Sequence, residues 1–505
     1  MTGGLKIRKM ARNHSRRLLR SLEIMPGAIS WSIIGFFVLL AVWRPVYCAV
    51  MIIVFDFYWI IRTIYLTTLL LLANRRLAKQ RRRAWLRSCQ KIPGWEQLRH
   101  LIIFPVYKEG LDILRPSLEA LRQTHYPQDK MVVVLAFEGR HQPSAETARV
   151  LEREYKDAFG SLLVTFHPDN LPGEKRLKGA NATWAAKRSR EYFEARGIAQ
   201  ERVIVSCFDA DTCVDREYFG CLTYHFLTVE RPHQASYQPV PVYNNNIWYA
   251  PAFARIIETS ASFCQMIESM RLEKFVTFSS HSMSFKTLVD IGYWPVDMIS
   301  DDSVVYWKAF LHFNGDYRVV PLYTTVSMDA AYSSNFFKTI WVQYRQKRRW
   351  AWGVENFPFL VRGLAKNRQI PLPVKMRRSF QLLESHVTWA IWAFVIGIIG
   401  PLPVFLGGRF FAQSAIGYNL PRITGLLFNF TMYASIVWIV LSWTILPPRP
   451  RDVPWVKNLA MAAEWVIVPA VILLLGSTPA LDAQTRLMLG RYMEFSATEK
   501  SRKVV

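Results

Sequence analysis

Two aspartates follow directly on a short apolar run in the middle of the chain. Residues 203–208 are rich in branched side chains and lead into Asp209-Ala210-Asp211. If the run forms a buried strand, both carboxylates lie at its carboxyl end, where parallel sheets bind their ligands. Carboxylate oxygens suit Mg²⁺ and Mn²⁺, and substrate phosphates often complete the coordination shell. Because this spacing also occurs in loops and helix caps, the pair alone is compatible with a metal site or a structural turn.

A second acidic pair, Asp301-Asp302, stands just before the helical pattern of residues 303–313. Aspartate and serine favour the start of a helix, where they cap the backbone and meet the positive end of the helix dipole. A carboxylate at the rim of a pocket can instead accept the proton of an attacking hydroxyl, as a general base. Asp301 could cap the helix while Asp302 faces the site, so the pair alone leaves both roles open.

A basic and aromatic cluster, QKRRW at positions 346–350, lies in a helical stretch of about residues 336–352. Such a cluster can belong to an interfacial helix whose cations reach the lipid headgroups. Alternatively, the planar guanidinium of Arg349 can hold a diphosphate while Trp350 stacks against a sugar. The residues around the cluster are compatible with either interpretation.

A folded domain must position these groups, and residues 98–335 show the alternating strand and helix patterns of such a domain. Short apolar runs predict buried strands, and amphipathic helical patterns lie between them. The expected strands are 101–106, 131–137, 162–166 and 203–208, and the expected helices are 111–124, 145–158 and 181–196. Strands and helices that alternate at this spacing imply right-handed crossovers. We therefore expect an α/β domain with a mainly parallel sheet covered by helices on both faces.

Charge and hydrophobicity are concentrated in different parts of the chain. The 505 residues include 63 Lys and Arg against 38 Asp and Glu, a formal net charge of +25, and 51% of them are hydrophobic. This composition excludes a disordered chain and a small disulfide scaffold. Apolar runs at 26–43 and 46–73 are each long enough to span a bilayer, and basic clusters flank the two runs. We therefore expect a transmembrane hairpin over 26–73 with both ends cytosolic.

The basic flanks have a second interpretation, as a surface that binds nucleic acid. Residues 1–20 and 74–91 contain no acidic group, and both stretches adjoin the apolar runs. That position favours a role in membrane orientation and in attraction to anionic lipid, so no nucleic-acid partner is expected. Asp56 and Arg62 lie inside the second run, where they either pair with each other or line a polar path.

Three further apolar segments follow the QKRRW cluster, at about 386–406, 423–446 and 459–475. Three crossings would place the tail outside the cell, whereas the basic residues of that tail favour the cytosol. One of the three segments could instead be re-entrant or interfacial. The sequence does not distinguish between these topologies.

The order of the motifs resembles that of processive family 2 glycosyltransferases, the cellulose synthase and hyaluronan synthase group. The shared features are a strand ending in D-x-D, an acidic pair before a helix, Q-x-x-R-W and flanking membrane spans, and they cover about residues 98–355. The resemblance implies a Rossmann-like domain of the glycosyltransferase A type, inserted between N-terminal and C-terminal transmembrane helices. It also implies metal-dependent transfer of a hexosyl group, with inversion, from a nucleotide-diphosphate donor to a growing polysaccharide. A UDP-sugar is the expected donor, and the reaction can be coupled to export.

The resemblance assigns the donor site. The segment FPVYKEG at 104–110 is similar to the family's V-P-x-Y-N-E motif for the base and ribose, with Lys in place of Asn. A glutamate stands where the family offers an aspartate to the base, and K-G-A-N at 178–181 resembles a segment that contacts the nucleotide. The implied donor-binding residues are Pro105, Tyr107, Glu109, Glu138, Lys178 and Asp209.

The resemblance also assigns the reacting centre. It implies that Asp211 binds Mg²⁺ or Mn²⁺ and that Asp302 is the catalytic base, with Ser300 and Asp301 replacing the Thr and Glu of a T-E-D motif. Residues 279–285 lie where the family has an acceptor-side motif, which they match poorly. The residues implied to bind the acceptor and the diphosphate are Gln346, Arg349 and Trp350. The tail sequence FSATEK resembles the F-x-V-T-x-K gating loop, which implies gating roles for Phe495, Thr498 and Lys500.

The sequence thus predicts an integral membrane protein with a cytosolic catalytic domain. The expected segments are a basic N-terminus (1–25), the hairpin (26–73), a basic linker (74–97), the transferase domain (98–335), amphipathic interfacial helices (336–379), further spans (380–476) and a basic tail (477–505). The expected partners are a nucleotide-sugar donor, a glycan or lipid acceptor, and the bilayer. Two alternatives stay open: a non-processive transferase acting on a lipid or polyprenyl phosphate, and a membrane scaffold whose transferase domain is inactive.

Overall fold

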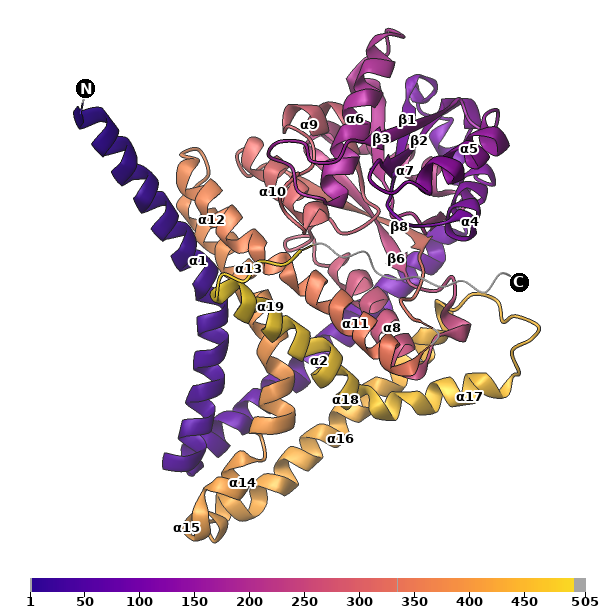
Figure 1. Ribbon diagram of the computed structural model, residues 1–505. Coiled ribbons are helices and arrows are strands. Elements are labelled where there is room, and N and C mark those ends of the chain that lie inside the picture. The colour runs from indigo at the N-terminus through magenta and orange to yellow at the C-terminus, as the bar shows by residue number, and fades with distance from the viewer. Residues whose placement is uncertain (1, 334, 495–505) are drawn as a thin grey trace. The chain divides into compact units, whose positions relative to one another are not determined.

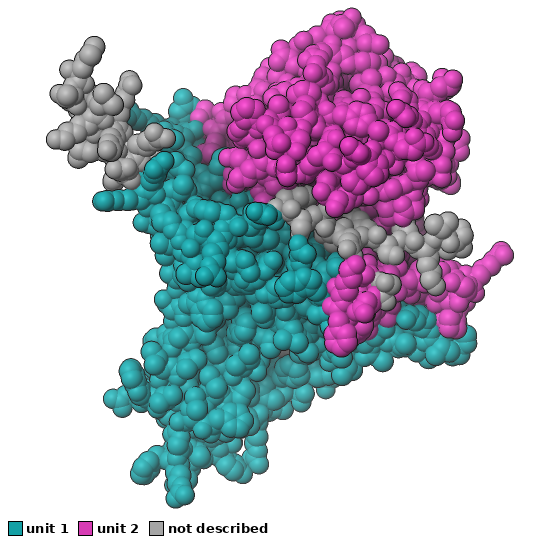
Figure 2. All heavy atoms as spheres, viewed as in Figure 1, with its two compact units in different colours: residues 1–68, 340–442, 455–494 teal, residues 69–339, 443–454, 495–505 magenta. Residues whose placement is uncertain are grey.

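The computed structural model describes residues 2–333 and 335–494 (Figure 1). These residues form two compact units (Figure 2). The helical unit comprises the chain up to Thr68, Ile340–Ser442 and Trp455–Glu494. The sheet unit comprises Leu69–Thr339 and Trp443–Pro454.

The sheet unit is built on a mixed, mostly parallel sheet. Its eight strands are β1 (Arg99–Val106), β2 (Met131–Glu138), β3 (Ser161–His167), β4 (Val203–Cys207), β5 (Cys213–Val214), β6 (Ala235–Val242), β7 (Ser282–Ser284) and β8 (Arg318–Ser327). Their order is β3-β2-β1-β4-β7-β6-β8-β5. Strands β1 to β4 pair in parallel, as do β6 and β8, whereas β7 and β5 pair antiparallel with their neighbours. The predicted α/β class with a mainly parallel sheet is confirmed.

The helices of the sheet unit follow the predicted alternation. They are α4 (Leu111–Arg122), α5 (Ser144–Tyr155), α6 (Lys178–Glu194), α7 (Tyr218–Thr228), α8 (Ala252–Glu268), α9 (Phe285–Asp290) and α10 (Asp301–His312). Every residue of β2 is buried, because helices pack on both faces of a parallel sheet. The predicted strands and the three predicted helices between them are confirmed, with ends that differ by a few residues.

The helical unit contains long apolar helices. They are α1 (Thr2–Trp43), α2 (Pro45–Arg81, whose last turns belong to the sheet unit), α13 (Leu372–Phe394), α16 (Ala415–Thr444) and a broken helical segment made of α17 (Val456–Ala463), α18 (Val468–Ile472) and α19 (Thr478–Met488). Five stretches of the described chain are long and apolar enough to cross a membrane: Arg16–Trp43, Pro45–Arg81, Leu372–Ile399, Ala415–Thr444 and Val456–Met488.

The chain turns between α1 and α2 at Arg44-Pro45, as expected for a helical hairpin. Near this turn, Phe37 and Ala41 of α1 pack with Cys48 of α2 and with Val395, just beyond α13. Proline fits the first position of α2, where the missing N–H has no intrahelical partner to lose.

Arg62 of α2 has different partners from those expected. Its guanidinium donates to the hydroxyl of Tyr58 at 2.7 Å and forms an ion pair with Glu384 of α13 at 3.5 Å. The pairing with Asp56 considered from the sequence is therefore replaced by a contact between two apolar helices. A charge inside an apolar segment is costly unless it finds such a partner.

The last apolar segment, Val456–Met488, has both of its ends held. Before it, the loop after α16 is bound within the sheet unit: Asn244 donates to the carbonyl of Ile445 at 2.8 Å, and Trp248 to that of Pro447 at 3.2 Å. At its far end, α19 packs along α1, where Ser30 donates to Gln484 at 2.7 Å. Arg20 of α1 also donates to the carbonyl of Leu487 at 2.7 Å, in the last turns of α19.

Candidate active site

Three charged side chains from distant parts of the sequence meet beside the carboxyl end of β4. Lys178 is the first residue of α6, Asp209 follows β4, and Asp302 lies in the first turn of α10. The Lys178 Nζ is 2.7 Å from Asp209 Oδ1 and 3.1 Å from Asp302 Oδ1. The fold therefore brings together one residue each from the D-x-D, acidic-pair and K-G motifs of the sequence.

A glycine allows the lysine to reach the two carboxylates. A Cβ at position 179 would overlap the carbonyl oxygen of Pro295 and lie 3.0 Å from the Cβ of Asp301. Only a residue without a side chain lets the start of α6 approach the segment that leads into α10 this closely. The sequence Lys178-Gly179 is thus a local requirement of the site geometry.

The ammonium of Lys178 is charged in this environment. Burial lowers the pKa of Lys178, but the carboxylates of Asp209 and Asp302 outweigh that effect and hold the pKa well above its ordinary value. Its side chain is 13% exposed. An opposite charge within a few ångströms favours the ionised form of both partners.

The segment 277–281 connects the two aspartates and had no assigned role from the sequence. Ser279 donates to Asp209 Oδ2 at 2.7 Å, and Thr277 donates to the backbone carbonyl of Asp302 at 2.6 Å. Ser280 adopts a left-handed conformation with φ +63° and exchanges a hydrogen bond with Thr212 at 2.9 Å. No sequence motif marks these contacts, because they depend on the antiparallel pairing of β7 with β4.

His281 lies buried beneath the cluster. Its Nδ1 is 3.1 Å from the carbonyl of Phe278 and 3.9 Å from Asp302 Oδ1. Burial lowers the pKa of His281, so the neutral ring with its proton on Nδ1 can donate to the carbonyl. The polarity of the cluster therefore comes from one ammonium and two carboxylates.

The helix start at α10 also differs in detail from the expected cap. Ser300 occupies the N-cap position, and Asp301 and Asp302 both lie in the first turn. Asp301 is therefore the first helical residue and not the cap. Acidic groups in this turn are favoured by the helix dipole, independently of any chemistry.

Asp211 is fully buried and fixed by the chain that follows β8. Its Oδ2 accepts the backbone N–H of Asp329 at 2.7 Å, and Asn245 donates to its carbonyl oxygen at 3.1 Å. Within the described residues, no group of three or more His, Cys, Asp or Glu side chains is placed to hold a metal ion. The carboxylates of Asp209 and Asp211 still fit a hard cation such as Mg²⁺ or Mn²⁺, which commonly uses one or two carboxylates together with water and substrate phosphates.

The ends of β1 to β3 hold the residues assigned to the nucleotide. Pro105 lies in β1, and the Glu109 carboxylate accepts the backbone N–H groups of Tyr107 at 2.8 Å and Lys108 at 3.1 Å. The Arg140 guanidinium lies over the Tyr107 ring, 4.7 Å from its centroid. Glu109 therefore shapes the turn that presents the aromatic ring.

Glu138 is buried at the end of β2, beside two cationic groups. Its Oε2 is 3.2 Å from Arg140 Nε and 3.8 Å from Nδ1 of His167, the residue opposite it on β3. Burial lowers the pKa of His167, but the nearby carboxylate of Glu138 and the hydrogen bond to Glu174 outweigh this effect and raise the pKa above its ordinary value. The longer carboxylate at this position is thus balanced by neighbouring positive charge.

The Q-x-x-R-W motif lies on α11 (Phe336–Ala351), and its three residues belong to the helical unit. Gln346 is buried, and the ammonium of Lys347 lies 3.6 Å from the centroid of the Trp350 ring. Arg348, within the cluster but outside the motif, donates to Asp482 of α19 at 2.9 Å. Asp482 also accepts from Tyr344 at 3.0 Å and Arg486 at 2.8 Å, so it fastens α11 to the last apolar segment.

Arg349 lies beside Arg348 in the last turn of α11. Phe495, Thr498 and Lys500, for which the sequence resemblance implies gating roles, lie outside the described residues.

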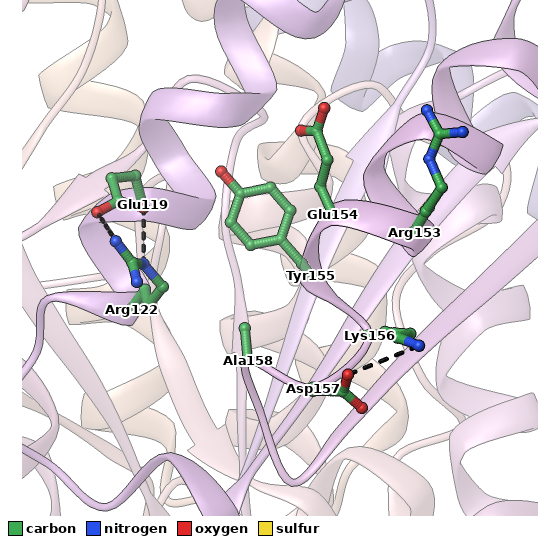
Figure 3. A pocket seen from close by; sticks show the side chains of 8 residues that line it. All are labelled: Glu119, Arg122, Arg153, Glu154, Tyr155, Lys156, Asp157 and Ala158. Atoms are coloured by element: carbon green, nitrogen blue, oxygen red, sulfur yellow. Dashed lines mark hydrogen bonds and ion pairs between the residues drawn. The ribbon is translucent and has the colours of Figure 1, made fainter.

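A separate surface recess of about 410 Å³ lies between the ends of α4 and α5 (Figure 3). Four of its charged side chains form two ion pairs, Glu119 with Arg122 at 2.8 Å and Lys156 with Asp157 at 3.7 Å. Because α4 and α5 return antiparallel to the strands they follow, their carboxyl ends lie at the opposite edge of the sheet from the Lys178 cluster. The recess is therefore distinct from the candidate site.

Comparisons with known proteins were made for the whole chain. Residues 204–475 match the family model described as glycosyl transferase family group 2. No curated protein sequence matches. Among solved structures, the mannosyltransferase PcManGT from Pyrobaculum calidifontis, in complex with GDP-Man and Mn²⁺, is 15% identical with a TM-score of 0.39, over 74% of this chain and 98% of its own. S. aureus TarS 1–349 in complex with UDP-GlcNAc is 12% identical with a TM-score of 0.37, over 67% and 91%.

Proposed function

The chain belongs to glycosyl transferase family group 2, whose model matches more than half of its length, and the protein is a glycosyltransferase. From this premise we propose that it transfers a hexosyl group, with inversion, from a UDP-sugar to a growing polysaccharide at the membrane. The observation that carries the proposal is the meeting of Lys178, Asp209 and Asp302 beside the carboxyl end of β4. This meeting supports a site that contains both the proposed base Asp302 and the D-x-D residue Asp209.

The proposed reaction uses Asp302 as the general base. Its carboxylate takes the proton of an acceptor hydroxyl, and the oxygen forms a bond to the anomeric carbon of the donor. The bond from that carbon to the diphosphate breaks on the opposite face, so the anomeric configuration inverts and the nucleoside diphosphate leaves. Asp209 positions the donor, and the cation of Lys178 balances the charge of the leaving group. The family resemblance also assigns Arg349 to the diphosphate.

A divalent cation fits this scheme. Asp211, with Asp209 nearby in the chain, would hold Mg²⁺ or Mn²⁺, and the ion would supply Lewis-acid neutralisation of the diphosphate. The buried Asp211 carboxylate is positioned for this by the backbone N–H of Asp329. The Asp211 carboxylate is thereby held in place before any donor binds.

We propose that the base and ribose bind where β1 and β2 end. There the Tyr107 ring and the Glu138 carboxylate offer a stacking face and a hydrogen-bond acceptor, with Arg140 between them. Pro105 and Glu109 contribute by shaping the turn that carries Tyr107.

We also place the protein in a membrane, with the sheet unit and both chain ends on the cytosolic side. The basic residues in the N-terminal half of α1 and at the end of α2 support this orientation. Asn244 of the sheet unit binds the loop before the last apolar segment, and within the helical unit α19 ends beside Arg20 of α1; each contact supports a cytosolic location for one end of that segment. We therefore propose that Val456–Met488 enters and leaves by the cytosolic face and that four helices cross.

A second candidate is the transfer of one sugar to a lipid or polyprenyl phosphate. Large apolar side chains are exposed at the start of the helix that carries Q-x-x-R-W, with Phe337 77% exposed and Trp341 54% exposed. Such a face could lie against an acyl chain of an acceptor as well as against bulk lipid. The Q-x-x-R-W motif and the FSATEK tail favour the polysaccharide instead.

Incubating membranes that contain the protein with labelled UDP- and GDP-sugars tests the proposal. A ladder of product sizes that depends on Asp302 supports the polysaccharide, whereas a single lipid-soluble product identifies the second candidate. Absence of both transfer and donor hydrolysis with every nucleotide sugar would favour an inactive scaffold.

A further inference from the structure

The ammonium group of Lys178 contacts the carboxylates of both Asp209 and Asp302. The Lys178 Nζ contacts Asp209 Oδ1 at 2.7 Å, and it reaches both oxygens of Asp302, at 3.1 and 3.2 Å. A lysine ammonium has three N–H donors, which equals the number of carboxylate oxygens that it contacts here. While this arrangement holds, the lone pairs of Asp302 face a cation and not an acceptor hydroxyl.

The two contacts differ in strength. The ion pair with Asp209 is short, at 2.7 Å, whereas the hydrogen bonds to Asp302 are longer, at 3.1 and 3.2 Å, and are divided between its two oxygens. Asp209 is also held by Ser279, so it is the better anchored partner. Of the two carboxylates, Asp302 is therefore the one that the ammonium releases more readily.

On the basis of the proposed function, we propose that Lys178 is a positioning residue that pairs with Asp302 in the donor-free enzyme and moves to the diphosphate when the donor binds. The start of α6 lies beside the cluster, so a small rotation of the lysine side chain suffices. The exchange makes and breaks ion pairs only, and the proton stays on Nζ. The base becomes free to accept a proton only after a diphosphate has taken its cation.

This exchange creates an energetic coupling between Asp302 and the nucleotide. Donor binding must break the Lys178–Asp302 contact, so the negative charge of Asp302 opposes diphosphate binding. Removing that charge should tighten binding, and the effect must pass through the lysine, because coupling between two groups is reciprocal. A lysine that only braces the two loops would give no such tightening.

The test measures binding of UDP and UMP, and of GDP and GMP, to the purified full-length protein by calorimetry at a fixed Mg²⁺ concentration. Asp302→Asn should bind the nucleoside diphosphate about threefold to tenfold more tightly than wild type, with little change for the monophosphate. Lys178→Met should weaken the diphosphate by about tenfold or more and the monophosphate much less. In the Lys178→Met background, the tightening by Asp302→Asn should vanish.

Two controls accompany the variants. Asp290→Asn removes one negative charge elsewhere in the same unit and should leave UDP affinity unchanged, which excludes a general charge effect. Lys178→Arg keeps the cation and should preserve most of the preference for diphosphate over monophosphate. Thermal unfolding of each variant confirms that it is folded, and Lys178→Gln takes the place of Lys178→Met if the latter does not fold.

The outcomes separate the two proposals. Wild-type protein that binds none of the four nucleotides overturns the proposed function. If wild type binds a diphosphate and Asp302→Asn binds it equally well or more weakly, the exchange is wrong and the function stands. Tightening that persists without Lys178 would also overturn the exchange, because the coupling would then act through another group.

Discussion

Asp302 lies in the first turn of α10 and within hydrogen-bonding reach of Lys178. The sequence offered a structural and a catalytic interpretation of the acidic pair, and the geometry accommodates both. A carboxylate in the first turn is favoured by the helix dipole, and the same turn faces the carboxyl end of β4. The fold therefore places the proposed base where the start of a helix stabilises its negative charge.

Replacing the proposed base by its amide should abolish transfer and preserve the fold. We expect Asp302→Asn to lower kcat by about 10²- to 10⁴-fold, because the amide cannot accept the acceptor's proton. Initial rates with the identified donor measure this loss, with Asp290→Asn as the matched control. Transfer at the wild-type rate in Asp302→Asn would remove the base assignment.

Gly179 is the second residue at which a small change has a defined cost. We expect Gly179→Ala to lower the free energy of unfolding by about 1–3 kcal/mol, since its Cβ would press against the Pro295 carbonyl and the Asp301 side chain. Thermal unfolding in detergent measures this loss of stability. The affinity for nucleotide should also fall, because the added Cβ displaces the start of α6 and with it Lys178.

Gly353→Ala is the control for that substitution. A Cβ at position 353 would meet its nearest neighbour, His386, at an ordinary contact distance of 3.7 Å. An equal melting temperature for Gly179→Ala and wild type would show that the start of α6 can accommodate a Cβ at position 179 without strain.

The secondary-structure elements were predicted unevenly. Strands β1 to β4 and the helices between them follow from apolar runs and local periodicity, which the chain shows clearly. Strands β5 and β7 have two and three residues, and their places are set by pairing with β8 and β4, far away in the sequence. Short antiparallel strands of this kind carry no periodic signal, so the sheet order beyond β4 was not foreseen.

The same reason explains which parts of the site were missed. The D-x-D aspartates, the acidic pair and Lys178 stand in motifs, and their placement at strand and helix ends was predictable. The hydrogen bond from Ser279 to Asp209 depends on β7 pairing beside β4 and on the left-handed backbone of Ser280. Neither feature leaves a mark in a single sequence.

At the level of packed helices, Asp482 forms the connection between α11 and α19. We expect Asp482→Asn to destabilise the helical unit by about 1–3 kcal/mol, because Arg348 and Arg486 lose a charged acceptor and Tyr344 a strong one. Arg348→Met should cost a similar amount, and the double variant should cost less than the sum. Unfolding in detergent or lipid nanodiscs measures all three.

Lys366→Met provides the comparison, since this exposed lysine lies at the end of α12 (Asn356–Lys366) and should have little effect. Strictly additive effects of the Asp482 and Arg348 substitutions would mean that the two side chains do not act as a pair.

At the scale of the whole molecule, the sequence left open whether the number of membrane crossings is odd or even. Five stretches are apolar enough to cross, yet the contacts at both ends of Val456–Met488 are with parts assigned to the cytosolic side. We therefore expect a reporter fused after Gly490 to behave as cytosolic, with fluorescent GFP and inactive alkaline phosphatase. A fusion after Gly408, in the turn between α14 (Leu402–Leu406) and α15 (Gly408–Ala412), should give the opposite result.

Active phosphatase at both positions would show that the last segment crosses the membrane. The tail would then lie on the far side, and its FSATEK sequence could not reach a cytosolic active site. The fusion experiment therefore also bears on the gating role expected for Phe495, Thr498 and Lys500.

The last apolar segment also constrains how the protein is made. Its most hydrophobic window exceeds those of the other four stretches, so during synthesis it is the segment that an insertion channel would most readily release into lipid as a span. Its docking partners, α1, α11 and α13, all precede it in the chain and have left the ribosome by the time it emerges. Asp482 can then meet Arg348 at once, and on the proposed topology the order of translation favours the return of this segment to the cytosolic face.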